Sequence, residues 1–190
     1  MLFDGGAVSA ALFQWGVVLG ASLAAALWDI KSRRIPNVLT LPLLGAGFLQ
    51  AVMFFGWDGF KSSLFASIVL ALPYVLLFLF AGGGAGDAKL MAGIGAWLGL
   101  PAAVEALVGI SICAVILALL RAFYSRRFFE VLGNIRVMMI AFMFFVGTRG
   151  KVQYAGGMET ADDKRALTMP YGPAIFAGLV GTAIYTAIVR

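Results

Sequence analysis

Long uncharged runs dominate this sequence and decide what it can fold into. A helix needs about 20 apolar residues to cross the roughly 30 Å hydrocarbon core of a bilayer. The uncharged runs are residues 5–28, 35–57, 62–86, 90–104, 106–120, 137–148 and 166–189. The chain is 62% hydrophobic and only 12% charged, whereas soluble domains are about 45–50% apolar and about 25% charged. The sequence therefore predicts an integral membrane protein, and it excludes a soluble enzyme, a disordered chain and a nucleic-acid-binding protein.

The two shorter runs in the middle of the chain read as parts of two helices. Only Glu105 separates 90–104 from 106–120, and Gly99-Leu100-Pro101 stands just before it. Proline and acidic residues both favour the first turn of a helix. We therefore expect a turn at 99–101, followed by a helix from about Pro101 to Phe123. The helix before this turn then begins near 84–86, at the membrane boundary.

The run 137–148 is the exception to this pattern. Its twelve residues would rise only about 18 Å as a helix, which is too short to cross. It follows a basic and aromatic run at 121–129 that is typical of an amphipathic surface helix. We expect a cytoplasmic or interfacial segment at about 121–168. The predicted fold is thus an all-α polytopic membrane helix bundle with six transmembrane helices, forming a single domain over residues 1–190.

The positive charges of the chain indicate its orientation. Six crossings place twelve of the fourteen Lys and Arg residues on one face, with Lys61 and Arg190 opposite. Cytoplasmic loops carry an excess of Lys and Arg. The face with twelve cations is therefore predicted to be cytoplasmic, and the N-terminus to lie outside.

The residues available for chemistry are few. The chain has no histidine, and Cys113 is its only cysteine. These counts exclude histidine-based catalysis, histidine metal sites and cysteine zinc cages. We expect no metal and no cofactor, with proton transfer carried by the nine carboxylates.

Two aspartates occupy the predicted cytoplasmic ends of spans. Asp29 closes the first span, and Asp87 follows the glycine-rich bend at 82–86. Two crossings lie between them, so both carboxylates are expected on the same side and at the same depth. By the same parity, Asp58 and Glu105 fall on the outer face, where we interpret them as membrane-interface residues.

Paired aspartates support a specific chemistry. Like charges a few ångströms apart cannot both ionise easily, so the pair shares a proton; one carboxylate can then activate water while the other protonates a carbonyl. An aspartic protease works in this way. The glycines at 82–86 allow positive φ and close approach of a substrate backbone. Taken singly, Asp29 is better interpreted as a solvated boundary residue, whereas Asp87 fits a boundary residue and a functional one equally well. Lys89 either pairs with an aspartate or simply adds to the inner positive charge.

Three segments resemble the type IV prepilin peptidases, a family of membrane aspartyl proteases. Residues 84–90 (GAGDAKL) are similar to the family's GxGD-x-K-L signature. Asp29, followed by basic residues and Ile35-Pro36-Asn37, resembles its first aspartate segment, and 169–175 (MPYGPAI) resembles the P-[FY]-G-P opening of its final span. The resemblance covers about residues 15–185.

The resemblance implies an enzyme that cuts the prepilin leader on the cytoplasmic side, with Asp29 and Asp87 as the catalytic dyad. The resemblance also implies that five matched residues support the substrate or the loop at the aspartates: Gly84, Gly86, Lys89, Pro36 and Asn37. Larger members carry a cytoplasmic insert with paired cysteines that is linked to N-methylation. This chain has no such insert, so it resembles the short, peptidase-only branch of the CpaA/TadV type that serves Flp/Tad pili. The implied location is the bacterial inner membrane.

Two other functions remain open from the residues alone. A small ion-coupled transporter would also use acids at the membrane edge and a glycine-broken helix. A non-catalytic component of pilus assembly would tolerate Asn at either aspartate. The expected partners are a membrane-anchored prepilin and membrane lipids, without nucleic acid, and the sequence indicates no oligomeric state.

Overall fold

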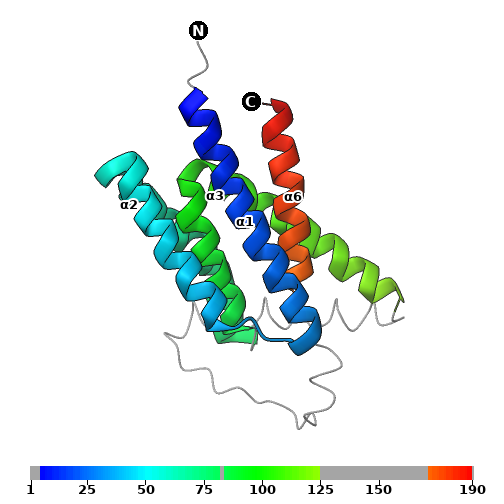
Figure 1. The fold of residues 1–190 in the computed structure, drawn as a ribbon. Coiled ribbons are helices and arrows are strands. Elements are labelled where there is room, and N and C mark those ends of the chain that lie inside the picture. Colours follow the sequence, from blue (N-terminus) through cyan, green and yellow to red (C-terminus); the bar gives the residue numbers. More distant parts are fainter. Residues whose placement is uncertain (1–4, 82–83, 125–170, 190) are drawn as a thin grey trace, which may run out of the picture.

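The computed structural model describes residues 5–81, 84–124 and 171–189 of the chain. Across these ranges the secondary structure is entirely helical: α1 (Gly5–Ser32), α2 (Asn37–Ala81), α3 (Ala85–Tyr124) and α6 (Gly172–Val189) (Figure 1). Each of these four helices is long and apolar enough to cross a membrane. The described part of the chain confirms the all-α class and a multi-pass membrane protein.

Helix α2 is two arms joined at a glycine. Its 45 residues would extend about 68 Å as one straight helix, more than twice the hydrocarbon thickness. Gly56 breaks it with φ 64° and ψ −150°, a conformation that is essentially restricted to glycine. The rings of Phe48 and Phe60, on either side of the break, have centroids 5.6 Å apart, whereas a straight helix would separate them by about 18 Å. The chain therefore folds back at Gly56.

Helix α3 is broken in the same way. Gly99 has φ 69° and ψ 172°, and Pro101 follows two residues later. The backbone N–H of Leu100 donates to Oγ of Ser62 at 3.0 Å, which ties this break to the second arm of α2. The turn predicted at 99–101 is confirmed, and α3 begins at Ala85, within the predicted range of 84–86.

The break in α2 differs from the expected boundary between two spans. The uncharged runs placed that boundary at the charged residues 58–61, but the non-helical residue is Gly56. Asp58 and Lys61 instead lie one turn apart on the second arm and form an exposed ion pair at 3.0 Å. A reversal needs a positive φ, which glycine adopts without strain, and the charged residues need only the membrane surface.

Two predictions about topology are not decided by these helices. Four whole helices qualify as candidate spans, so the count of six crossings stays a prediction. The run 137–148 lies outside the described residues. The segment predicted at 121–168 also lies outside them, except for its first residues, which continue α3 to Tyr124.

Helix α3 forms the centre of the packing. Its first arm packs on both arms of α2, and its second arm packs on α6. A Cβ atom at Gly95 would lie 2.5 Å from the carbonyl oxygen of Ala66, so this glycine allows the two backbones to approach. The larger fully buried side chains come from all four helices: Val18, Leu70, Leu90, Met91, Ile94, Ile110, Ile175 and Leu179. Large apolar side chains on the outer faces are exposed, as expected for helices that contact lipid.

A chain of polar contacts joins three helices inside the bundle. Nε2 of Gln14 donates to Oε1 of Gln50 at 3.1 Å, and Nε2 of Gln50 donates to the carbonyl oxygen of Trp97 at 3.3 Å. Nε1 of Trp97 donates to the carbonyl oxygen of Leu43 at 2.8 Å. Unsatisfied polar groups are costly in hydrocarbon. These bonds therefore fix α1, α2 and α3 in one relative register, which determines where their ends meet.

Candidate active site

Asp29 is a buried carboxyl group at the end of α1. Its side chain is 6% exposed, and its Oδ2 accepts a hydrogen bond of 2.9 Å from the backbone N–H of Gly172, the first residue of α6. Arg33 adopts φ 50°, and its N–H donates to the carbonyl oxygen of Asp29 at 2.8 Å. A left-handed residue of this kind commonly terminates a helix. Helix α1 thus ends at Ser32, within one turn of Asp29, and the carboxyl group of Asp29 contacts α6.

Asp87 lies in the first turn of α3 and is partly buried. Its backbone N–H donates to the carbonyl oxygen of Gly84 at 3.2 Å. A Cβ atom at Gly84 would lie 2.8 Å from Oδ2 of Asp87, and one at Gly86 would lie 3.0 Å from Cβ of Ile35. The two glycines of the G-x-G-D segment therefore leave room for the carboxyl group and for contact with the α1–α2 connection.

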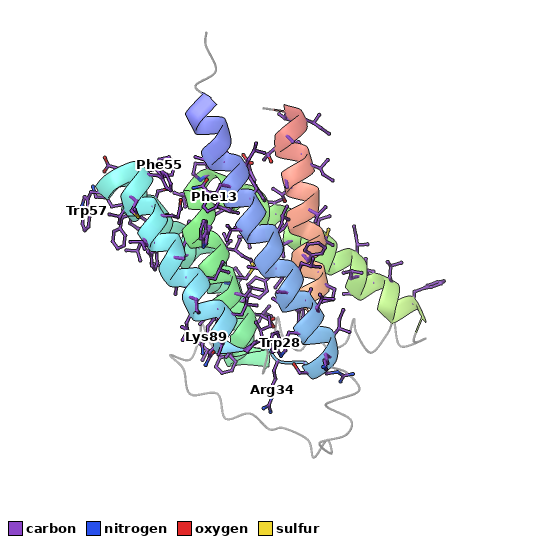
Figure 2. All side chains as sticks on the ribbon, in the orientation of Figure 1. Phe13, Trp28, Arg34, Phe55, Trp57 and Lys89 are labelled. Atoms are coloured by element: carbon purple, nitrogen blue, oxygen red, sulfur yellow. The ribbon has the colours of Figure 1, made fainter. Side chains whose placement is uncertain are left out.

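The two aspartates lie at the same end of the bundle, where the negative charge of Asp29 acts electrostatically on Asp87. Figure 2 shows Trp28, Arg34 and Lys89 at this end, and Phe55 and Trp57 at the opposite end. The start of α1 and the end of α6 also lie at the opposite end (Figure 1). Asp58, beside Trp57 in the sequence, is thus separated from the pair by the length of the bundle.

Lys89 links the start of α3 to the start of α2. Its Nζ donates to Oδ1 of Asn37 at 2.9 Å. The carbonyl oxygen of Pro36 accepts the N–H groups of Leu39 and Thr40 at 3.1 and 3.4 Å, which closes the first turn of α2. The structure therefore brings the predicted support residues Gly84, Gly86, Lys89, Pro36 and Asn37 to the same end as the two aspartates, and the bond of Lys89 is made to Asn37.

Two tyrosines complete the surroundings of Asp87. Tyr74, on the second arm of α2, and Tyr171, just before α6, interact electrostatically with Asp87 and with each other. Partial burial, followed by the negative charge of Asp87, raises the pKa of Tyr171. The phenol of Tyr171 therefore stays protonated at neutral pH and retains a proton to donate.

The sequence did not identify Tyr74, Tyr171 or Gly172 as site residues. The motif at 170–173 indicated only the opening of the final span. The number of predicted crossings did indicate that Tyr171 and Gly172 lie near the aspartates, because the last span starts at the same end where Asp29 and Asp87 were expected. Tyr74 carries no such signal, since its position depends on how the second arm of α2 is rotated.

This arrangement can support acid–base chemistry. Two carboxyl groups from different helices interact in a partly desolvated place, and neighbouring hydroxyl and amide donors surround them. A close pair of this kind holds one proton more readily than it holds two negative charges. It can therefore accept a proton at one oxygen and donate one at another.

The fold and the site together define a multi-pass membrane protein with an aspartate pair at one end of its helices. The chain belongs to the type IV leader peptidase family, whose model matches residues 16–119, more than half of the chain. The matched range contains both Asp29 and Asp87. This confirms the family resemblance seen in the three sequence segments.

Two relatives from Burkholderia pseudomallei, strains 1026b and K96243, are both named prepilin leader peptidase/N-methyltransferase. Each is 32% identical to this chain over 136 residues, which cover 66% of this chain and 42% of the relative. The chain thus spans less than half the length of the curated relatives it matches. No solved structure matches the chain.

Proposed function

We propose that this protein is a membrane aspartyl endopeptidase that removes the leader of type IV prepilins, with Asp29 and Asp87 as its catalytic dyad. The observation that carries the proposal is the electrostatic interaction of these two carboxyl groups, which lie 58 residues apart in the sequence and come from different helices. Membership of the type IV leader peptidase family supports it. We further propose prepilins of the Flp/Tad type as substrates.

The proposed reaction is hydrolysis of one peptide bond. One carboxylate takes a proton from water, whose oxygen attacks the scissile carbonyl carbon, while the protonated carboxyl gives its proton to the carbonyl oxygen. The resulting tetrahedral diol collapses and the C–N bond breaks. The first carboxyl passes its proton to the leaving nitrogen, and a diol hydroxyl returns a proton to the second carboxylate. The products are the leader carboxylic acid and the free pilin amine, and the dyad regains its starting state.

The place of the pair suits a substrate that is anchored in the membrane. A prepilin is held by one apolar helix, so the bond at the edge of that helix lies at the membrane surface. Asp29 and Asp87 lie at the ends of membrane-length helices, at the same edge. We place this edge on the cytoplasmic side of the bacterial inner membrane, because the topology with six crossings assigns twelve of the fourteen Lys and Arg residues to it.

The proposed topology has six crossings with the N-terminus outside. The arms of α2 and α3 on either side of Gly56 and Gly99 would each cross once, and α1 and α6 would supply the remaining two crossings. This topology returns the chain to the cytoplasmic edge at both Asp29 and Asp87.

A processing assay tests the proposal. A Flp-type prepilin is co-expressed with the wild-type chain, with Asp29→Asn or with Asp87→Asn, and the pilin is analysed by mass spectrometry. Asn keeps the size of the side chain but cannot carry the proton, so each variant should process at least about 100-fold more slowly. Asp58→Asn is the matched control, because Asp58 is exposed and paired with Lys61 far from the dyad.

The outcomes separate the candidate functions. Processing by wild type and Asp58→Asn, but by neither dyad variant at matched membrane levels, supports the peptidase. Full processing by both dyad variants would show that the aspartates are not catalytic. If the wild-type chain leaves type IV prepilins of every class intact, the peptidase proposal is overturned and ion-coupled transport becomes the next function to measure.

A further inference from the structure

The first turn of α6 presents one backbone donor to the dyad. The carbonyl oxygen of Tyr171 accepts the N–H of Ile175 at 3.1 Å, so the helix begins at Gly172. The first N–H groups of a helix have no partner inside that helix, and Pro173 has no N–H at all. The N–H of Gly172 donates instead to Oδ2 of Asp29 at 2.9 Å, across 143 residues of sequence.

Only glycine fits where this contact is made. Gly172 is buried, and a Cβ atom there would lie 2.9 Å from Cα of Ala26, 3.0 Å from Cβ of Asp29 and 3.2 Å from Oδ2 of Asp29. A side chain at this position would push α6 away from α1. The lack of a side chain is therefore what brings the amide within hydrogen-bond distance of the carboxyl group.

The neighbouring residue meets the other aspartate. Tyr171 interacts electrostatically with Asp87, and Gly172 is bonded to Asp29. Two consecutive residues, one just before α6 and one at its start, thus act on both members of the pair: Tyr171 electrostatically on Asp87, and Gly172 through a backbone hydrogen bond to Asp29. This segment lies beyond residues 16–119, the range matched by the family model.

We propose that Gly172 is a positioning residue of the peptidase, whose backbone N–H holds Oδ2 of Asp29 and so leaves Oδ1 for the reacting water. This inference rests on the proposed function of the dyad. A carboxyl group at a helix end rotates freely unless one oxygen is bound, and the partial positive charge of a helix N-terminus strengthens that bond. A small misplacement of a reacting group costs a large factor in rate.

A single-atom change tests this role directly. The full chain is made by cell-free translation into lipid vesicles with glycolic acid in place of Gly172, which replaces the N–H by an ester oxygen and adds no side chain. The matched control carries the same ester at Gly181, in the same helix, where a Cβ atom would meet no other atom within 4 Å. The measured quantities are kcat and KM for a synthetic prepilin peptide, alongside wild type and Asp29→Asn.

We expect the ester at Gly172 to lower kcat by about 10- to 100-fold with KM within about twofold, because a hydrogen bond to a charged group is lost while the binding surface is kept. The ester at Gly181 should leave both constants within about twofold. The positioning role is overturned if the ester at Gly172 keeps the wild-type kcat, or if both esters lower kcat equally. The dyad is still supported in that case, provided that wild type is active and Asp29→Asn is inactive. An inactive wild-type chain overturns the dyad and the positioning role together.

Alanine variants give a second, independent measure. Gly172→Ala should lower kcat at least as much as the ester does, because its Cβ atom would force the α6 amide away from Asp29. Gly181→Ala meets open space and should behave as wild type. Equal activity of the two alanine variants, at equal amounts of folded protein, would contradict the role of Gly172.

Discussion

A carboxyl group buried at the end of a helix, such as that of Asp29, needs a hydrogen-bond partner. Burying a charged or polar group without one costs several kcal/mol, by order of magnitude. Asp29 is 6% exposed and bonded to Gly172, whereas Asp87 is more accessible and interacts with two phenols. The two carboxyl groups therefore have different surroundings, which favours a division of the acid and base roles between them.

The contact between Lys89 and Asn37 yields a prediction at this scale. The bond of 2.9 Å joins the helix that carries Asp87 to the first residue of α2. Lys89→Met and Asn37→Ala should each lower kcat/KM for prepilin cleavage by about 3- to 10-fold. The double variant should be no slower than the slower single variant, since both changes remove the same bond.

The control for this pair is Lys61→Met, which breaks an exposed ion pair at the other end of the bundle. It should leave kcat/KM unchanged. Losses that multiply in the double variant would show that Lys89 and Asn37 act independently, contrary to the structure.

Some residues of the site can be predicted from sequence motifs, whereas others are identified only once the helices are packed. Asp29 and Asp87 belong to local motifs with two predicted crossings between them. Motif spacing and the number of crossings were therefore enough to predict that both lie at the same end of the helices. Gly172 contributes a backbone N–H, and a sequence pattern does not reveal which distant side chain such a group will meet. Tyr74 lies in an apolar run, where a tyrosine reads as an ordinary membrane residue.

Among the elements, the glycine breaks in α2 and α3 determine how the long helices fold back. Gly56 has φ 64°, and a Cβ atom added there would meet no other atom within 4 Å, so replacement by alanine introduces backbone strain without a steric clash. We expect Gly56→Ala to lower the free energy of unfolding by about 1–3 kcal/mol. The measurement is the unfolding midpoint in mixed detergent micelles.

Gly45 is the matched control on the same helix. It too has open space around a Cβ position, but its backbone is helical. Gly45→Ala should raise the free energy of unfolding by up to about 1 kcal/mol, because alanine loses less conformational freedom in a helix. A loss of stability as large as that of Gly56→Ala would contradict the account of the break.

The sequence predicted the two breaks unequally well. At 99–101 a glycine, a proline and a nearby acid coincide, and the turn lies where they indicate. In α2 the charged residues at 58–61 suggested the boundary, but they mark the membrane surface and the reversal itself is at Gly56. Backbone freedom, which only glycine offers there, determined the position of the reversal.

For the whole molecule, the distribution of charge makes a prediction about orientation. In a Cys113→Ser background, which removes the only native cysteine, Lys61→Cys should react with a membrane-impermeant maleimide in intact cells. Arg34→Cys should react only after the membrane is permeabilised. Both native side chains are exposed. Lys61 lies one turn beyond Trp57, which Figure 2 shows at the end of the bundle opposite Arg34.

The reverse labelling pattern would place the aspartates on the outer side and would contradict cytoplasmic cleavage.

The orientation was predicted by counting cations and crossings, which requires no knowledge of packing. The relative rotation of the helices could not be predicted in this way, because uniformly apolar runs give little indication of which face turns inward.

The central claim is that Asp29 and Asp87 act as one catalytic unit. Its most direct test is kcat for prepilin cleavage by the reconstituted wild-type chain, Asp29→Asn, Asp87→Asn and the double variant. Residues that act as a unit are strongly non-additive, so each single change should lower kcat by at least about 100-fold, and the double variant should be no slower than the slower single one. Losses that multiply in the double variant, or a single variant that keeps the wild-type kcat, would contradict the account.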